Sequence, residues 1–256
     1  MNLLLKNYLV FLSLLAFGGV MCGRLNITDD QFVLALIKQL GVDLNLSPVQ
    51  PKRFVRAASP VQVIVQQQAQ RYMKQALWWL LLEPSNNGFK PSRYTSFNTR
   101  YDKLNVPRTA GYQPFRQSRC IIVAKGFGET EFIQQGSRKV PQHYYDMTAV
   151  NGAIAFGGLY KEYVCKETGE VTIGCSIITL PAHEKLKRIH TKASPLMLPQ
   201  DTITLDAWLD PNYQDVQAFT HLLKPAIRQD LSAVKIDKPS TFKAVADPIF
   251  IEADAY

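Results

Sequence analysis

Cys22 follows Met21 directly and precedes Gly23-Arg24, so a chain begun at Met21 and trimmed of its methionine has an N-terminal cysteine. A terminal cysteine carries a thiol with a reference pKa of about 8.5 and an α-amine of about 7.7–8.0, so modest tuning makes both nucleophilic near neutral pH. The amine can form a Schiff base with an aldehyde, and the thiol can then close on the imine carbon to give a thiazolidine ring. An internal cysteine cannot close this ring.

Three further residues have side chains suited to assist such chemistry. His190 can give and take a proton near neutrality, Glu129 supplies a carboxylate, and Asn98 is a neutral donor and acceptor. Taken singly, each has a structural explanation: a loop imidazole, a surface carboxylate and a turn amide, with Cys22 as a small buried thiol. Only the set of four, at these positions in the chain, points to a function.

The composition predicts one large globular domain. The chain has 256 residues, of which 46% are hydrophobic and 20% charged, enough for a core that needs no disulfides. The net charge of +8 favours polyanions such as nucleic acid or anionic lipid, although many basic proteins bind neither. The four cysteines, Cys22, Cys120, Cys165 and Cys175, have no zinc-binding spacing, so we expect reduced thiols and no metal site.

Residues 1–20 are typical of a targeting segment, with one lysine and an apolar run from Tyr8 to Phe17. Bulky Val20 and Met21 fit a cleavage site poorly. Three interpretations stay open: upstream sequence with Met21 as the true start, an export signal, or a membrane anchor that is short for a spanning helix. We therefore divide the chain into an N-terminal extension, residues 1–21, and a domain of residues 22–256.

The elements that must position these residues are mixed helices and strands. Thr28 followed by Gln31 is typical of a capping box, and a stripe of apolar residues then predicts a helix ending at Gly41. Strands are predicted at residues 61–65 and 120–124, a hairpin at 153–164 and 171–179, and short helices at 205–209 and 215–223; residues 76–82 fit a strand or a helix. The glycines of residues 125–129 predict a turn that holds Glu129 at a strand end.

Residues 83–118 differ from the rest of the chain. Proline, asparagine, glycine and serine are frequent here, and arginines and lysines alternate with phenylalanines and tyrosines. Such a segment suits a single-stranded nucleic acid, because bases stack on aromatic rings and phosphates need cations. A solvated surface loop explains the same composition equally well.

Five stretches of the sequence together resemble one known family. They are Met21-Cys22-Gly23-Arg24, Arg53-Phe54 with Ala57, Asn98-Thr99-Arg100-Tyr101-Asp102, Arg119-Cys120 through Gly126-Phe127-Gly128-Glu129, and residues 177–179 followed by Ile189-His190 and Pro195. In order and spacing they are similar to motifs of the SOS response-associated peptidase (SRAP) family of abasic-site processing proteins. The resemblance covers residues 22–209, most of the chain.

The resemblance implies a fold, a reaction and site residues. The fold is a single α+β domain of mixed, barrel-like sheets with peripheral short helices and a basic groove. The function is covalent crosslinking of abasic sites in single-stranded DNA, with self-processing peptidase and lyase or reversal activity, without metal or cofactor. The catalytic residues are Cys22, Asn98, Glu129 and His190, and the DNA-binding residues are Arg24, Arg100, Arg108 and Thr179. We expect a monomer, cytoplasmic and nucleoid-associated if the chain starts at Met21 or Cys22, and membrane-bound or periplasmic if residues 1–20 are a signal.

The sequence departs from the family pattern beside the reactive residues. Thr99, Asp102, Ala124 and Thr130 replace alanine, glutamate, proline and tryptophan, and one extra residue separates His190 from Pro195.

Two other functions stay open. A thiol peptidase acting in trans would use Cys22, His190 and Asn98 and would not need the amine of Cys22. An exported lipoprotein or binding module would carry lipid on Cys22.

Overall fold

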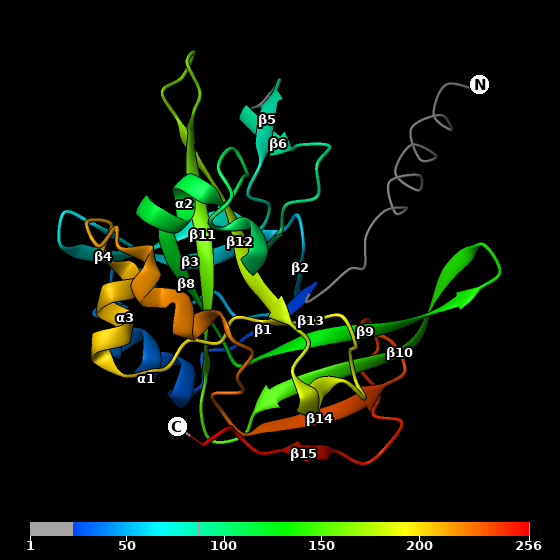
Figure 1. Cartoon of the computed structure of the whole chain (residues 1–256). Helices are drawn as coiled ribbons and strands as arrows, with labels where there is room; N and C mark the ends of the chain where they lie inside the picture. The colour runs from blue at the N-terminus through cyan, green and yellow to red at the C-terminus, as the bar shows by residue number, and fades with distance from the viewer. Residues whose placement is uncertain (1–22, 87, 256) are drawn as a thin grey trace, which may run out of the picture.

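A computed structural model describes residues 23–86 and 88–255, and the predictions made for residues 1–22 fall outside them. Two large sheets, a small hairpin and several short helices make up this part of the chain (Figure 1). The helices lie against one sheet and the second sheet lies apart from them (Figure 1). The fold is therefore α+β, as predicted.

The first sheet has six strands in the order β15-β14-β10-β9-β1-β2. Its strands are β1 (Arg24–Ile27), β2 (Lys52–Arg56), β9 (Gly126–Gln135), β10 (Arg138–Ala149), β14 (Leu231–Ile236) and β15 (Ile249–Ile251). Neighbouring strands all pair antiparallel, and β9 and β10 extend from the body as a long hairpin (Figure 1). Strand β1 thus lies between β2 and β9, so the chain that follows residue 22 enters the sheet directly.

The second sheet contains a closed barrel. Strands β11 (Ile154–Val164), β8 (Arg119–Ala124), β3 (Pro60–Gln67), β4 (Gln70–Leu77) and β12 (Val171–Pro181) pair in that order, and β11 also pairs with β12. This last pairing closes the five strands. Strands β7 (Asn98–Arg100) and β13 (Ala193–Pro195) add to β12, and β5 (Leu82–Ser85) with β6 (Gly88–Pro91) forms a separate hairpin.

Strands β8, β11 and β12 of the barrel are largely buried on both faces. One alternating set of side chains, including Val63, Ile122 and Cys175, packs with the six-stranded sheet. The other set, including Ile64 and Ile121, packs under the helices. Burial on both faces explains why these strands have near-continuous apolar sequences rather than alternating ones. The helices are α1 (Gln31–Gln39), α2 (Tyr112–Gln117) and α3 (Thr202–Leu209), with short turns η1 (Tyr101–Lys103), η2 (Glu184–Leu186) and η3 (Val216–Leu223).

Most predicted elements are confirmed, including strands β3 and β8, the β11–β12 hairpin, helix α3 and turn η3. In the segment 76–82, strand β4 ends at Leu77 and strand β5 begins at Leu82. The irregular segment 83–118 contains β5, β6, β7, η1 and α2, so it is more regular than predicted. The turn predicted at Glu129 is wrong, because residues 126–135 form one continuous strand.

Helix α1 begins two residues later than predicted. Its N-cap is Asp30, whose carboxylate accepts hydrogen bonds from the backbone N–H groups of Phe32 (2.9 Å) and Val33 (3.1 Å). Thr28 instead donates its hydroxyl to Asp30 at 2.9 Å, so it supports the cap without being the cap. Gly41, with a φ of 75°, follows the helix in the left-handed region that favours glycine.

We expect Asp30→Ala to lower the free energy of unfolding by about 1 kcal/mol, the usual cost of losing a capping side chain. The measurement is urea unfolding followed by circular dichroism. Asp29→Ala is the matched control, because Asp29 is exposed and adjacent. Equal unfolding midpoints for the two variants would contradict the assignment of the cap.

Candidate functional site

Glu129 and His190 lie together, although they are far apart in the sequence. The Oε2 atom of Glu129 is 3.6 Å from Nδ1 of His190, and the two residues are 3% and 5% exposed. Glu129 projects from β9 on the same face as Phe127, a core residue two positions earlier. His190 follows η2 and Ile189, which is buried in the same core. The structure thus brings two of the four predicted catalytic residues together.

The imidazole of His190 is favoured in its neutral form. Burial and the positive charge of Lys192 lower its pKa below the usual 6.5, while a hydrogen bond with the backbone of Thr130 acts in the opposite direction. Oε2 of Glu129, 3.6 Å from Nδ1, lies beyond hydrogen-bond distance of the imidazole. Nε2 of His190 is buried and has no hydrogen-bond partner among the described residues. At neutral pH the side chain is therefore suited to accept a proton.

Glycine at position 128 allows Arg24 to cross β9 beside Glu129. The two residues pair across β1 and β9, and a Cβ atom on Gly128 would lie 2.5 Å from Nε of Arg24. The guanidinium donates to the carbonyl oxygen of Glu129 at 2.8 Å and to Oγ1 of Thr130 at 3.0 Å. Arg24, predicted to bind DNA, is 8% exposed and ties β1 to the backbone that carries Glu129.

Asn98 and Thr179 lie on neighbouring strands at one edge of the barrel. Strand β7 pairs parallel with β12, which places Asn98 opposite Ile177 and Arg100 opposite Thr179. Thr179 also pairs with Pro195 of β13, the strand that follows the His190 loop. The hydroxyl of Thr179 is buried and has no hydrogen-bond partner within residues 23–86 and 88–255. Asn98 is half-buried.

The two remaining predicted DNA-binding residues are exposed. The side chain of Arg100 is 66% exposed and forms a two-pronged contact with Asp102, at 3.0 Å and 2.8 Å. Asp102, which replaces the family's glutamate, thus keeps a carboxylate on this arginine. Arg108 is exposed in the segment after η1, with a φ of 68°.

Cys22 lies outside the described residues, but the residue that follows it does not. The carbonyl oxygen of Gly23 accepts a hydrogen bond from the backbone N–H of Ala57 at 3.3 Å. Arg24 pairs with Gly128, and the antiparallel register continues toward Gly23 and Glu129. The described start of the chain is therefore next to the strand position that carries the carboxylate.

Sequence reasoning missed the local partners of this pair. Lys192 lowers the pKa of His190, and Thr130 contacts Arg24 through its hydroxyl and the imidazole of His190 through its backbone. Tyr144 of β10 lies under Arg24, with 5.5 Å between the guanidinium carbon and the ring centroid. Strand β10 was not predicted, so nothing in the sequence pattern placed Tyr144 here. Thr130 did stand out, as a departure from the family pattern.

We expect Lys192→Met to raise the pKa of His190 toward 6.5, because the substitution removes a nearby positive charge. The measurement is an NMR pH titration of the imidazole in the free protein. Lys187→Met is the control, since Lys187 is in the same loop and pairs with Glu184 at 2.6 Å. Equal shifts in the two variants would show that Lys192 has no specific effect.

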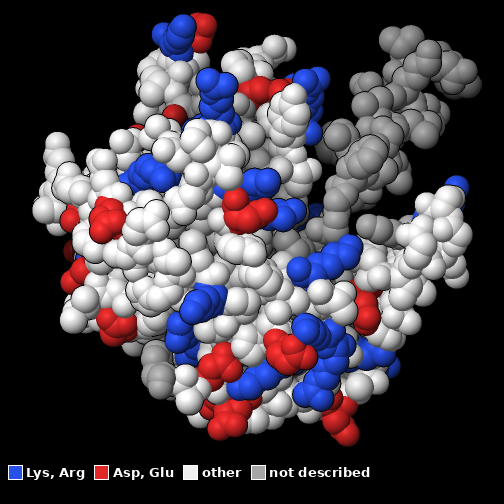
Figure 2. Space-filling view, viewed as in Figure 1, with Lys and Arg blue, Asp and Glu red and all other residues white. Residues whose placement is uncertain are grey.

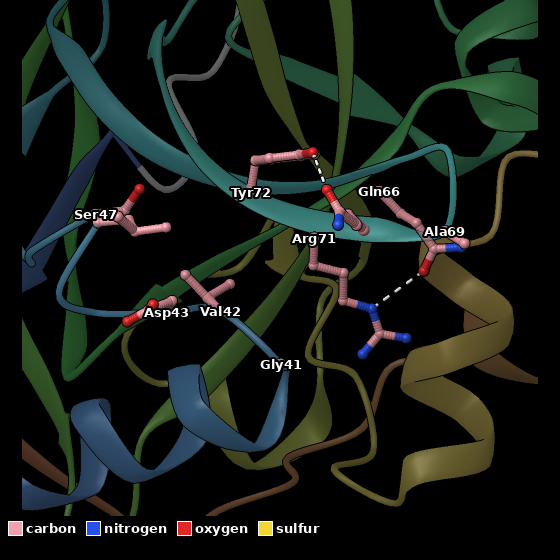
Figure 3. A pocket seen from close by; sticks show the side chains of 10 residues that line it. Gly41, Val42, Asp43, Ser47, Gln66, Ala69, Arg71 and Tyr72 are labelled. Carbon is pink, nitrogen blue, oxygen red and sulfur yellow. Dashed lines mark hydrogen bonds between the residues drawn. The ribbon is translucent and has the colours of Figure 1, made fainter.

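A cavity of about 500 Å³ lies elsewhere in the molecule. Gly41, Asp43, Arg71 and Tyr72 are among the residues that line it, and none of the predicted site residues does (Figure 3). Arg71 is committed to structural contacts there, with Gln66 at 3.1 Å and with Asp206. This cavity therefore has no part in the chemistry of Glu129 and His190.

Within residues 23–86 and 88–255, no three histidine, cysteine or acidic side chains gather as metal ligands would. No helix in the same residues is long and apolar enough to cross a membrane.

Comparisons with known proteins identify relatives of the whole domain. A family model described as SOS response associated peptidase (SRAP) matches residues 21–239. A crystal structure of a protein from Bacteroides thetaiotaomicron has a TM-score of 0.62 and 20% identity, covering 86% of this chain and 94% of its own. A phage-related protein from Bordetella bronchiseptica has a TM-score of 0.59 and 16% identity, covering 85% and 95%. A search of curated proteins gives no significant match.

Proposed function

The chain belongs to the SOS response associated peptidase (SRAP) family, and from that premise we propose that it crosslinks covalently to abasic sites in single-stranded DNA through Cys22. Family membership supports a function related to DNA damage and a peptidase-like activity. The observation that carries the proposal is the buried pair of Glu129 and His190, beside strand β1, which begins two residues after Cys22.

The proposed reaction joins the protein to the open, aldehyde form of the abasic sugar. The α-amine of Cys22 attacks C1′ and the carbinolamine loses water to give an imine. The thiol sulfur then adds to the imine carbon, and its proton passes to the nitrogen, which closes the thiazolidine. The net change is one water lost. No metal or small-molecule cofactor takes part, and we expect a monomer to suffice.

Glu129 and His190 supply the proton transfers in this scheme. Neutral His190 accepts a proton from the sugar hydroxyl as the ring opens and returns it on closure. Glu129 moves protons at the amine of Cys22 and at the departing oxygen, in imine formation and in the reverse or lyase direction. Asn98 orients the sugar or the cysteine without taking a proton.

The DNA backbone is held by cations and polar groups in this proposal. Arg100 and Arg108 are exposed, and their guanidinium groups suit phosphate oxygens. The buried hydroxyl of Thr179 is a further polar group for contact with the DNA backbone. Arg24 contributes its charge from beside Glu129, while its own hydrogen bonds hold β9. Binding through phosphates should weaken as salt concentration rises.

The test is the intact mass of the protein, made from the full reading frame, with a single-stranded oligonucleotide that carries one abasic site. We expect a protein that begins at Cys22 and gains the oligonucleotide mass less one water. Cys22→Ala and Cys22→Ser both keep the α-amine and lack the thiol, so neither should form the stable adduct, and each should give only a Schiff base that borohydride must trap. An oligonucleotide with a tetrahydrofuran site, which has no aldehyde, is the control.

Two results would overturn the proposal. A protein that begins at Cys22 and gains no mass is not an active crosslinking protein. A protein that retains residues 1–20, or carries lipid on Cys22, belongs to the membrane or the periplasm. We otherwise propose a cytoplasmic, nucleoid-associated location, because chromosomal abasic sites are found there.

A peptidase acting on other proteins is the second candidate, favoured by the description of the family. It would use the thiol of Cys22 as nucleophile and His190 as base, and the amine would have no role. Acetylation of the N-terminal amine separates the two functions. The acetylated protein should keep peptidase activity and lose all crosslinking.

A further inference from the structure

His190 is carried by a loop that leaves the barrel and returns to it. Pro181 of β12 pairs with Ala193 of β13 at the base of this loop, residues 182–192. Inside the loop, the N–H of His190 donates to the carbonyl of Leu186 at 2.8 Å. Leu186 and Ile189 are 3% and 1% exposed. The loop is thus anchored at its base and by two apolar side chains.

A tail that follows β15 reaches this loop from another part of the molecule. The backbone N–H groups of the tail anchor it to the body: that of Ala253 donates to Oδ1 of Asp230 at 2.8 Å, and that of Asp254 donates to the carbonyl of Ile227 at 2.9 Å. The N–H of Ile227 in turn donates to Oδ2 of Asp254 at 2.8 Å. The tail lies beyond residues 21–239, which the family model matches.

Both carboxylate oxygens of Asp254 contact residues at the start of the loop. Oδ2 lies 2.9 Å from Nε2 of His183, and Oδ1 lies 2.9 Å from Nζ of Lys185. Lys185 also donates to the carbonyl of Glu252 at 2.8 Å. We name these three residues, Asp254, His183 and Lys185, the tail clamp.

His183 connects the clamp to both ends of the loop. Its Nδ1 accepts the N–H of Lys185 at 3.2 Å, so Nε2 carries the proton that faces Asp254. Its own N–H donates to Oγ of Ser194 in β13 at 2.8 Å. Holding His183 therefore fixes the first turn of the loop against the strand that follows His190.

The surroundings of the clamp are balanced in charge. Figure 2 shows basic and acidic side chains interleaved over the face that carries β13, β14 and β15. Burial raises the pKa of Asp254, but hydrogen bonds from Lys185 and Ile227 and the nearby positive charges hold it below the usual value. The carboxylate is thus ionised at neutral pH and keeps both contacts.

We propose that the tail clamp is a positioning device for His190, with Asp254 as a positioning residue that acts through His183 and Lys185. This inference rests on the proposed function for its effect on rate, and it has its own readout in the free protein. Ion pairs at this level of exposure contribute little to stability. Here the ion pairs restrict the motion of the loop that carries His190. His190 must contact Glu129 and the substrate, and a small misplacement of its side chain slows the reaction.

The test compares Asp254→Ala with the wild-type protein in two measurements. The crosslinking rate at saturating abasic-site DNA should fall about ten-fold, with the half-saturating DNA concentration unchanged. In the NMR titration of the free protein, the pKa of His190 should move up toward 6.5, because a loosened loop admits water. Asp254→Asn, which keeps a hydrogen-bond acceptor for His183, should recover part of the rate.

Asp247→Ala is the matched control, because it removes an exposed carboxylate from the same C-terminal segment. If the Asp254→Ala protein keeps both the wild-type crosslinking rate and the wild-type pKa of His190, the proposed role of the tail clamp is wrong. If the wild-type protein does not crosslink, the proposed function is wrong. The NMR titration of His190 in the free protein still tests the role of the tail clamp in that case. If Asp254→Ala does not fold, Lys185→Met, which leaves the bonds of the tail to Ile227 and Asp230, must show both changes.

Discussion

Replacing Glu129 with glutamine is expected to slow crosslinking of abasic-site DNA by about 10²–10⁴-fold, the usual contribution of a positioned proton-transfer group. The substitution keeps the size of the side chain and removes its ability to exchange a proton. Glu129 is 3% exposed and its carboxylate faces Nδ1 of His190, so no water replaces it readily. The fold should survive, because the contact of Arg24 is with the backbone carbonyl of Glu129.

The measurement is the single-turnover rate of crosslinking, with non-covalent affinity for the same strand without an abasic site measured in parallel. Affinity should change less than two-fold or so, because glutamine removes no cation. Glu131→Gln is the control: it makes the same chemical change two residues along β9, where the side chain is only half-buried. Equal loss in both variants, or no loss in Glu129→Gln, would remove Glu129 from the reaction.

The barrel strands and the short helices could be predicted because their patterns are local. The β11–β12 hairpin has two runs of strand-forming residues around a glycine turn, and Gly169 has the positive φ, 73°, that such a turn requires. Helix α1 was predicted from its apolar stripe, but its cap was wrong by two residues. Asp30 and Thr28 are both good capping residues, and only the backbone conformation selects Asp30.

Strands β9 and β10 show where local patterns fail. Gly126 and Gly128 favoured a turn, yet both lie inside β9 because neighbours occupy the space that side chains would need. A Cβ atom on Gly126 would lie 2.2 Å from the carbonyl oxygen of Met147, and one on Gly128 would meet Arg24. These glycines serve close approach between strands, which the sequence does not distinguish from a turn.

The site itself could be proposed only from the resemblance to a family. Glu129 and His190 come from separate sheets, and no periodicity brings them together. Their contact depends on the pairing of β9 in one sheet and on the loop between β12 and β13 in the other. The resemblance implied that Arg24 binds DNA, but nothing in it indicated the hydrogen bond from Arg24 to the carbonyl of Glu129. The tail clamp could not be foreseen, because its residues have no distinctive spacing.

The second large effect concerns stability and involves Arg119. Its side chain is 3% exposed and donates to backbone carbonyls at the C-terminal ends of two helices. It reaches Phe115 of α2 at 2.7 Å, Trp208 of α3 at 2.7 Å, and Asp210 and Tyr213 beyond α3 at 2.6 and 2.9 Å. Burial lowers the pKa of Arg119 to about 10, against the opposing effect of Asp210 and Tyr213, so the group stays charged at neutral pH. The last carbonyl groups of a helix have no hydrogen-bond partner within that helix, and the guanidinium of Arg119 donates to such carbonyl groups of both α2 and α3.

We expect Arg119→Met to lower the free energy of unfolding by about 3–5 kcal/mol, since buried acceptors are left without donors. That is a large share of the 5–15 kcal/mol or so that stabilises a typical domain. Arg119→Lys should recover only part of this loss, because one ammonium group cannot reach both helices at once. The measurement is urea unfolding. The control is Arg138→Met, which replaces an exposed arginine near the β9–β10 turn. Its free energy of unfolding should stay within about 0.5 kcal/mol of that of the wild type. A loss below about 1 kcal/mol in Arg119→Met would mean that water or rearranged helix ends replace the guanidinium, and that α2 and α3 are held by their apolar contacts alone.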